Sequence, residues 1–131
     1  MSDRQLSRIC YVEDDEDIQR IARMALEKIG GFTVRVVSDP LTAIEVMKDF
    51  KPDLVMLDWM MPGMDGPTLF RAMKEDTYTN GLPVVFITAK ASQHELDELR
   101  TLGAVGTISK PFSPRELPAQ LKSIWGTVPP R

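Results

Sequence analysis

The chain has 131 residues, of which 43% are hydrophobic and 27% are charged, and its formal net charge is -3. This length predicts one domain that buries about two-thirds of its unfolded surface and is too short for a multidomain enzyme. The composition excludes a disordered or a fibrous protein. The slightly acidic charge excludes a general attraction to nucleic acid or to an anionic membrane surface.

Short apolar runs alternate with longer amphipathic runs five times along the chain, which is the pattern of βα units. In the first amphipathic run, apolar residues recur at helical spacing from Ile18 to Ile29, and Gly30 ends the helix. We expect strands over 9–12, 32–37, 53–58, 84–88 and 105–109. We expect helices over 18–29 and 40–50, through Leu69 and Met73, and over 91–102 and 113–125. In the helix over 91–102, the leucines expected to face the core are Leu96, Leu99 and Leu102.

Five βα units joined by right-handed crossovers predict an α/β fold, a doubly wound, five-stranded parallel sheet with five helices on its two faces. We expect residues 1–126 to form this domain. Pro129 and Pro130 cannot continue a helix, so 127–131 is expected to be a C-terminal tail or the start of a linker. Binding sites in such sheets form at the carboxyl ends of the strands. The residues at those ends are therefore the candidates for function.

Acidic residues dominate the predicted strand ends. Glu13 and Asp14 follow the first strand and Asp58 ends the third, while Thr88 ends the fourth and Lys110 follows the fifth. Carboxylates forced together repel one another unless a cation joins them, and oxygen ligands without His or Cys favour magnesium or calcium over zinc. An incomplete cage of this kind suits magnesium beside a phosphate. Asp58 is then a candidate nucleophile for a phosphoryl group, whose oxygens Lys110 and Thr88 would hold.

Four separated motifs make the chain similar to the receiver domain of two-component response regulators, the CheY-like, flavodoxin-like fold. The resemblance covers residues from about 7 to 125. The motifs are Val12-Glu13-Asp14, Asp58 with the tract 61–66, Thr88-Ala89 and Lys110-Pro111-Phe112. Each motif alone is common, but their order and their places at strand ends make the combination specific.

The resemblance implies a role for each acid. Asp58 would be the phosphoacceptor and a magnesium ligand, and Asp14 would bind the ion directly. Glu13 would act through metal-bound water, and the backbone carbonyl of Met60 would be a third protein ligand. Asp15, which follows the acidic pair, is interpreted instead as the N-terminal cap of the first helix.

The resemblance also implies roles for Lys110 and Thr88. Lys110 would pair with the Asp58 carboxylate and later with the phosphoryl group, and the Lys110–Pro111 peptide bond would be cis. Thr88 would bond the phosphoryl group and move with it. A sensor histidine kinase or a histidine phosphotransfer protein would donate the group, in a phosphorelay that ends at a downstream protein or a following output domain. The receiver would catalyse its own phosphorylation and dephosphorylation.

Cysteine and histidine usage adds exclusions. The chain has one cysteine, Cys10, and one histidine, His94, so it forms no internal disulfide and no Cys/His zinc site. We expect Cys10 to be buried and His94 to face solvent. No apolar run approaches the roughly 20 residues of a membrane span, and the N-terminal residues lack the apolar core of a signal peptide. The expected compartment is reducing cytoplasm, without membrane or nucleic-acid partners for this chain.

Three other functions compete with the receiver interpretation. Aspartate-nucleophile phosphatases need a second aspartate two residues after the nucleophile, where this chain has Met60. A flavodoxin-like cofactor binder needs a phosphate loop rich in Ser, Thr and Gly after the first strand, where five acidic residues stand at 13–17. A degenerate receiver that only binds partners would not need the acids, Thr88 and Lys110 together.

The sequence departs from the receiver pattern on the fifth strand. Many receivers carry Tyr or Phe three residues before the lysine, whereas this chain has Thr107. A small β-branched side chain cannot fill and vacate a pocket as a ring does, so the switch is expected to use the segment 90–93 and the helix after it. Met60 and Lys90 occupy the variable positions that flank the family's site. The expected partner face includes the charged residues Glu95, Asp97, Glu98 and Arg100.

Overall fold

The computed structural model describes residues 5–89 and 92–129, and within them five parallel strands form one sheet in the order β2-β1-β3-β4-β5. The doubly wound parallel fold predicted from the sequence is confirmed. Each strand ends within one residue of its predicted end, because an apolar run stops at a charged or polar residue at that edge. The strands are β1 (Arg8–Val12), β2 (Thr33–Val37), β3 (Leu54–Asp58), β4 (Val84–Thr88) and β5 (Gly106–Ser109).

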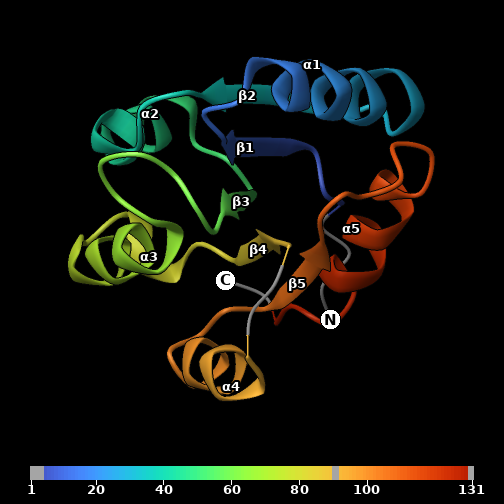
Figure 1. The fold of residues 1–131 in the computed structure, drawn as a ribbon. Coiled ribbons are helices and arrows are strands. Elements are labelled where there is room, and N and C mark those ends of the chain that lie inside the picture. Colours follow the sequence, from blue (N-terminus) through green and yellow to red (C-terminus); the bar gives the residue numbers. More distant parts are fainter. Residues whose placement is uncertain (1–4, 90–91, 130–131) are drawn as a thin grey trace.

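Helices cover both faces of the sheet (Figure 1). One face packs against α1 (Glu16–Met24) and α5 (Leu117–Trp125). The other face packs against α2 (Ala43–Phe50), α3 (Gly66–Glu75) and α4 (Gln93–Thr101). None of the helices in the described ranges has the length and apolar character required to cross a membrane.

The first helix, α1, begins directly after its N-terminal capping residue, Asp15. The Asp15 carboxylate accepts hydrogen bonds from the backbone N–H groups of Asp17 and Ile18, so the predicted cap is confirmed and α1 starts at Glu16. Beyond Met24 the chain continues as the π-helical turn η1 (Ala25–Ile29). Ile21 and Ile29 fit the helical spacing of the sequence, but both are exposed.

Two other helices are shorter than predicted. The segment 40–50 begins as a 3-10 turn, η2 (Pro40–Thr42), before α2. The expected helix over 113–125 starts only at Leu117, because Pro118 lacks a backbone N–H and is tolerated only in the first helical turn. In the helix predicted over 91–102, Ala91 lies outside the described residues, and Leu102 is exposed at the C-cap of α4 instead of facing the core.

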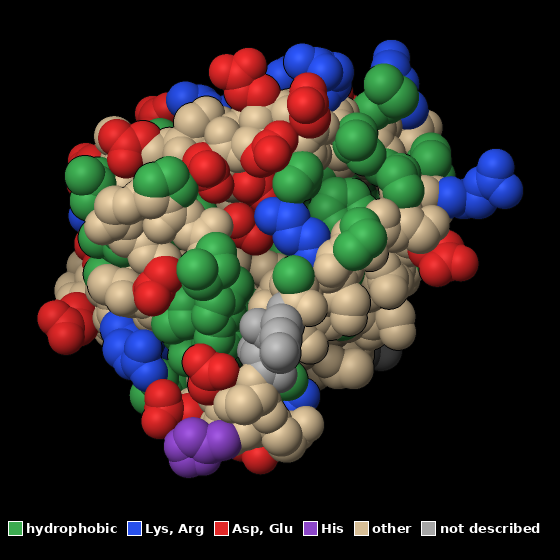
Figure 2. Space-filling model, viewed as in Figure 1, with side chains coloured by type: hydrophobic (Ala, Val, Ile, Leu, Met, Phe, Trp, Pro, Cys, Tyr) green, Lys and Arg blue, Asp and Glu red, His purple; other side chains and the backbone are tan. Residues whose placement is uncertain are grey.

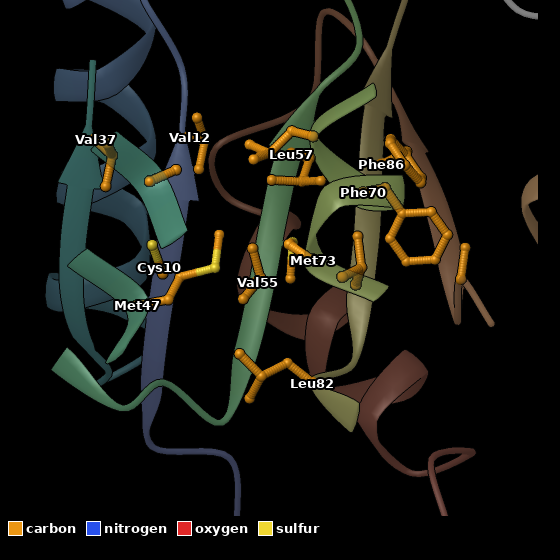
Figure 3. Packing of buried hydrophobic residues seen from close by; sticks show 14 of the residues in the cluster. Cys10, Val12, Val37, Met47, Val55, Leu57, Phe70, Met73, Leu82 and Phe86 are labelled. Carbon is orange, nitrogen blue, oxygen red and sulfur yellow. The ribbon is translucent and has the colours of Figure 1, made fainter. Parts of the chain in front are cut away.

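Side chains of the central strands alternate between the two layers of the core. Cys10 and Phe86 face α2 and α3, where they meet Met47 and Phe70 (Figure 3). The buried position of Cys10 was predicted from its place within the strand. The opposite alternation places Tyr11 in the layer under α1 and α5. Residues two positions further along each strand keep the same face, which decides where the side chains at the strand ends point.

β3 carries the central acid to the carboxyl edge of the sheet. All five of its residues are buried, as expected for a parallel strand covered on both faces. Val12 of β1 pairs with Leu57 of β3, so the next residue along each strand brings Glu13 beside Asp58. On the other side, Asp58 pairs with Ile87 of β4. The strand order therefore gathers the predicted site residues at one edge of the sheet.

The expected domain boundary at residue 126 stays a prediction.

Candidate functional site

Three carboxylates meet at the carboxyl ends of β1 and β3. Glu13, Asp14 and Asp58 each offer an oxygen atom, and these atoms lie within 4.8 Å of one another. Glu13 is 0% exposed and Asp58 is 3% exposed, whereas Asp14 is open to solvent. Acidic side chains gather around the start of α1 on the face that Figure 2 shows. The cluster therefore has a buried floor and one side open to an incoming group.

Lys110 joins the two buried acids. Its Nζ atom donates hydrogen bonds of 3.0 Å to Glu13 Oε1 and of 3.0 Å to Asp58 Oδ1. The backbone N–H of Lys110 donates to the Thr88 carbonyl at 2.9 Å, which ties the start of the loop after β5 to the end of β4. The Lys110–Pro111 peptide bond is cis, as the resemblance implied. The sheet thus places one cation between acids that are 97 and 52 residues away in the sequence.

Negative charge exceeds positive charge in this cluster. Burial raises the pKa of Asp58 from its ordinary 3.8 to about 6, even though the hydrogen bond from Lys110 acts in the opposite direction. The neighbouring charges of Glu13 and Asp14 raise that pKa further. Burial would lower the pKa of Lys110, but its hydrogen bonds to Asp58 and Glu13 outweigh burial and raise it. The ionised site therefore needs more positive charge than one lysine supplies.

The donor set fits a hard divalent cation. Its ligand atoms are carboxylate oxygens on one open side of the site, and a single ammonium group cannot neutralise three of them. Magnesium prefers a few carboxylates together with water, whereas zinc prefers His and Cys. Among the described residues, His94 is exposed on α4 and Cys10 is buried inside the sheet, so neither belongs to this cluster.

Both oxygens of Glu13 are hydrogen-bonded. Glu13 Oε1 accepts from the Tyr11 hydroxyl at 3.1 Å as well as from Lys110, and Glu13 Oε2 accepts from the backbone N–H of Asp15 at 3.0 Å. Tyr11 is fully buried, and burial, followed by the charge of Glu13, raises its pKa, so its hydroxyl is a donor at neutral pH. Sequence reasoning missed Tyr11. The signal was its place two residues before Glu13 on one strand, which puts both side chains on the same face.

The loop after β3 is held tightly against Asp58. A side chain at Gly66 would place its Cβ 2.4 Å from the Asp58 carbonyl oxygen, so only glycine fits there. The N–H of Gly66 donates to the Trp59 carbonyl at 2.8 Å. Asp65 caps α3 by accepting from the N–H of Thr68 at 2.8 Å. These contacts fix the backbone that follows the central acid.

The remaining predicted residues lie around this cluster. Met60 is in the loop after β3 and its side chain is 75% exposed, so only its backbone remains a candidate ligand. Thr88 is half-buried at the end of β4, beside β3 in the sheet. Thr107 is exposed on β5. Lys90 lies outside the described residues.

Comparisons with known proteins agree with this geometry. A family model described as the response regulator receiver domain matches residues 9–122. The phosphate regulon transcriptional regulatory protein PhoB of Pseudomonas aeruginosa is 39% identical over 116 residues, which are 88% of this chain and 50% of PhoB. The DNA-binding response regulator MtrA of Mycobacterium tuberculosis is 34% identical over 121 residues, 92% of this chain and 51% of MtrA. The chain spans about half the length of the curated relatives it matches.

A solved structure has the same fold. The chemotaxis protein CheY4 of Vibrio cholerae superposes with a TM-score of 0.83, over 91% of this chain and 98% of CheY4. The two sequences are 24% identical, so this likeness concerns the arrangement of the five strands and their helices.

Proposed function

Because this chain belongs to the response regulator receiver domain family, we propose that it is a phosphorylation switch with Asp58 as its phosphoacceptor. The donor is the phosphohistidine of a sensor histidine kinase or of a histidine phosphotransfer protein. The protein acts in the cytoplasm, where such kinases present their phosphohistidine. One observation carries the proposal: a buried carboxylate at a strand end lies beside two further acids, with the Lys110 ammonium 3.0 Å away.

The transfer step uses the ionised carboxylate of Asp58. One carboxylate oxygen forms a bond to phosphorus while the bond between phosphorus and the donor imidazole nitrogen breaks, and the electron pair of that bond stays on the imidazole. At neutral pH Asp58 is mainly ionised, because its pKa of about 6 lies below the pH. The open side at Asp14 gives the donor access, and the buried floor holds Asp58 in place.

The surrounding residues hold the product. Lys110 already contacts the Asp58 carboxylate and is positioned to pair with an oxygen of the attached phosphoryl group. Thr88 ends the strand next to Asp58 and would donate its hydroxyl to another oxygen. Magnesium, held by the Asp14 and Asp58 carboxylates, by the Met60 carbonyl and through water by Glu13, would neutralise charge on the phosphoryl oxygens.

The switch would pass its signal on through a change of conformation. Phosphorylation adds charge at the ends of β3 and β4, and Thr88 would carry that change towards α4, whose exposed charges form a partner surface. The receiver catalyses its own phosphorylation and dephosphorylation. The printed names of PhoB and MtrA describe a transcriptional regulator and a DNA-binding regulator. For this chain we propose a downstream protein or a following output domain as the receiver of the signal.

The proposal is tested with a small phosphodonor. Acetyl phosphate and magnesium should add one phosphoryl group to the wild-type protein, seen by intact-mass analysis, and the substitution Asp58→Asn should abolish it. Asp76→Asn is the matched control, because Asp76 is also ion-paired to a lysine, Lys48, but lies after α3. The same mass increase in Asp58→Asn would show that the phosphoacceptor is another residue.

A further inference from the structure

We infer that Tyr11 is a positioning residue of this site, because its buried hydroxyl fixes Glu13 in the orientation that the magnesium-binding acids require. The inference rests on the proposed function and goes beyond the acids, the threonine and the lysine of the receiver pattern. It is carried by the 3.1 Å contact between Tyr11 Oη and Glu13 Oε1, which joins two fully buried residues, whereas Asp14 of the same cluster is exposed.

The backbone of Glu13 is fixed before its side chain is considered. Its N–H donates to the Val37 carbonyl at 2.9 Å, which extends the pairing of β1 with β2. Its carbonyl accepts a hydrogen bond from the Gln19 side chain. The side-chain torsions of Glu13 are therefore the remaining freedom, and the bonds to its two carboxylate oxygens decide them.

Of the two donors to Glu13 Oε1, Tyr11 and Lys110, only Lys110 also binds a second acid. Lys110 divides its bonds between Glu13 and Asp58, and the Asp15 N–H binds the other oxygen, Oε2. When Lys110 turns towards a phosphoryl group on Asp58, Glu13 Oε1 would lose one of its two donors while 0% exposed. A buried carboxylate without a donor is costly. The Tyr11 hydroxyl keeps that oxygen bonded and so frees Lys110 for the product.

A neutral donor also preserves the charge of the site. A second lysine or an arginine in place of Tyr11 would orient Glu13 as well, but it would cancel the negative charge that attracts a cation. The tyrosine hydroxyl orients the carboxylate without that cost. The ring is anchored by complete burial in the layer under α1 and α5, so the hydroxyl is placed rigidly.

The test compares two single-atom deletions. Tyr11→Phe removes the hydroxyl and keeps the ring, and Tyr78→Phe does the same to the chain's other tyrosine, which lies after α3 beside the Lys51 ammonium. Magnesium titrations would follow the fluorescence of Trp59, which adjoins Asp58, with Trp125→Phe as the common background. We expect Tyr11→Phe to weaken magnesium binding about tenfold, as loss of a partner of a metal-site residue does. Tyr78→Phe should leave the magnesium midpoint within about twofold of that background.

A double-mutant cycle separates positioning from a general structural role. If Tyr11 acts through Glu13, Tyr11→Phe should have little further effect on magnesium binding once Glu13→Gln is present. Urea unfolding without magnesium reports any loss of stability in each variant. A loss of stability together with an unchanged magnesium midpoint in Tyr11→Phe would overturn the inference, and so would an equal effect with and without Glu13→Gln.

The inference and the proposed function fail in different ways. If acetyl phosphate labels Asp58 in the wild type but Tyr11→Phe binds magnesium normally, the function stands and Tyr11 has no positioning role. If Asp58 is never labelled but Tyr11→Phe weakens magnesium binding about tenfold, the positioning role stands for a metal site of another function.

Discussion

Two lysine–aspartate pairs in this molecule join the same two chemical groups, but the pKa of the aspartate is raised in one pair and lowered in the other. Lys110 Nζ lies 3.0 Å from Asp58 at the sheet edge. Lys48 Nζ lies 2.8 Å from Asp76, and this ion pair joins α2 to the turn after α3. The pKa of Asp58 is raised to about 6, mainly by burial, whereas that of Asp76 is lowered to about 2, mainly by the hydrogen bond from Lys48.

The partners of each aspartate explain the difference. Asp76 accepts two backbone N–H bonds, from Tyr78 and Thr79, in addition to the 2.8 Å contact with its lysine, and the second acid near that lysine, the exposed Glu45, lies farther away at 3.9 Å. Asp58 shares Lys110 with Glu13 and stands beside Asp14. The pair at α3 is therefore satisfied by the fold alone, whereas the pair at the site remains short of positive charge, which a cation would supply.

The largest expected effect comes from removing the shared lysine. Lys110→Ala leaves Glu13 and Asp58 buried without their common donor, so we expect a loss of about 2–3 kcal/mol in the free energy of unfolding at neutral pH. Lys48→Ala should cost clearly less, because that pair is more exposed. Urea unfolding measures both, and magnesium chloride should recover part of the loss in Lys110→Ala only. Equal losses of unfolding free energy in Lys110→Ala and Lys48→Ala would contradict the proposed difference between the two lysine–aspartate pairs.

Removing the carboxylate of Asp58 and removing that of Asp76 should change the free energy of unfolding in opposite directions. Asp58→Asn relieves a buried, crowded charge, so we expect the magnesium-free protein to gain about 1–2 kcal/mol of stability at neutral pH. Asp76→Asn should destabilise, because it loses the ion pair and weakens the turn that the carboxylate holds. Urea unfolding at pH 7 without divalent cations measures the change in the free energy of unfolding of each variant relative to wild type. A stability loss in Asp58→Asn would contradict the charge excess at the site.

The pH dependence of stability sharpens the same contrast. The folded-state pKa of Asp58 lies above its ordinary 3.8, so its ionised form destabilises the fold, and this penalty grows as pH rises from about 3.8 to about 6. The folded-state pKa of Asp76 lies below 3.8, so its contribution is present above pH 3.8 and is lost as pH falls towards about 2. The stability difference between Asp58→Asn and wild type should therefore grow between pH 4 and pH 6, within the window of that shift. A difference that stays constant over this range would show that Asp58 titrates normally.

The smallest expected effect is conformational. Beryllium fluoride with magnesium imitates the phosphoryl group, and we expect it to change hydrogen exchange in α4, between residues 93 and 101, but not around Lys48 and Asp76. Thr88→Ala should leave Asp58 phosphorylatable and remove the change in α4, because the hydroxyl that follows the phosphoryl group is gone. Changes confined to the loop after Asp58 in the wild type would show that the signal takes another route.

Local patterns in the sequence were sufficient for the order and type of the elements. Apolar runs that stop at Asp58 and Thr88 identified two strand ends, and Asp15 identified the start of α1, because strand burial and helix capping depend on neighbouring residues. The same patterns failed at the start of α5 and after Met24, where a π-helical turn replaces the end of the expected regular helix. Proline position and a π-helical turn there change the local geometry without changing the hydrophobic spacing.

The sequence by itself determined which acids, which lysine and which threonine stand at the strand ends. Only the tertiary structure decided how they are bonded: Lys110 is shared by Glu13 and Asp58, and the Tyr11 hydroxyl donates a hydrogen bond to Glu13. The pKa of Asp58 was likewise undetermined, since it depends on burial and on charges brought from distant segments. Capping and strand periodicity act over a few residues, whereas charge pairing here acts across 97 positions of the chain, so it exists only once the sheet has assembled.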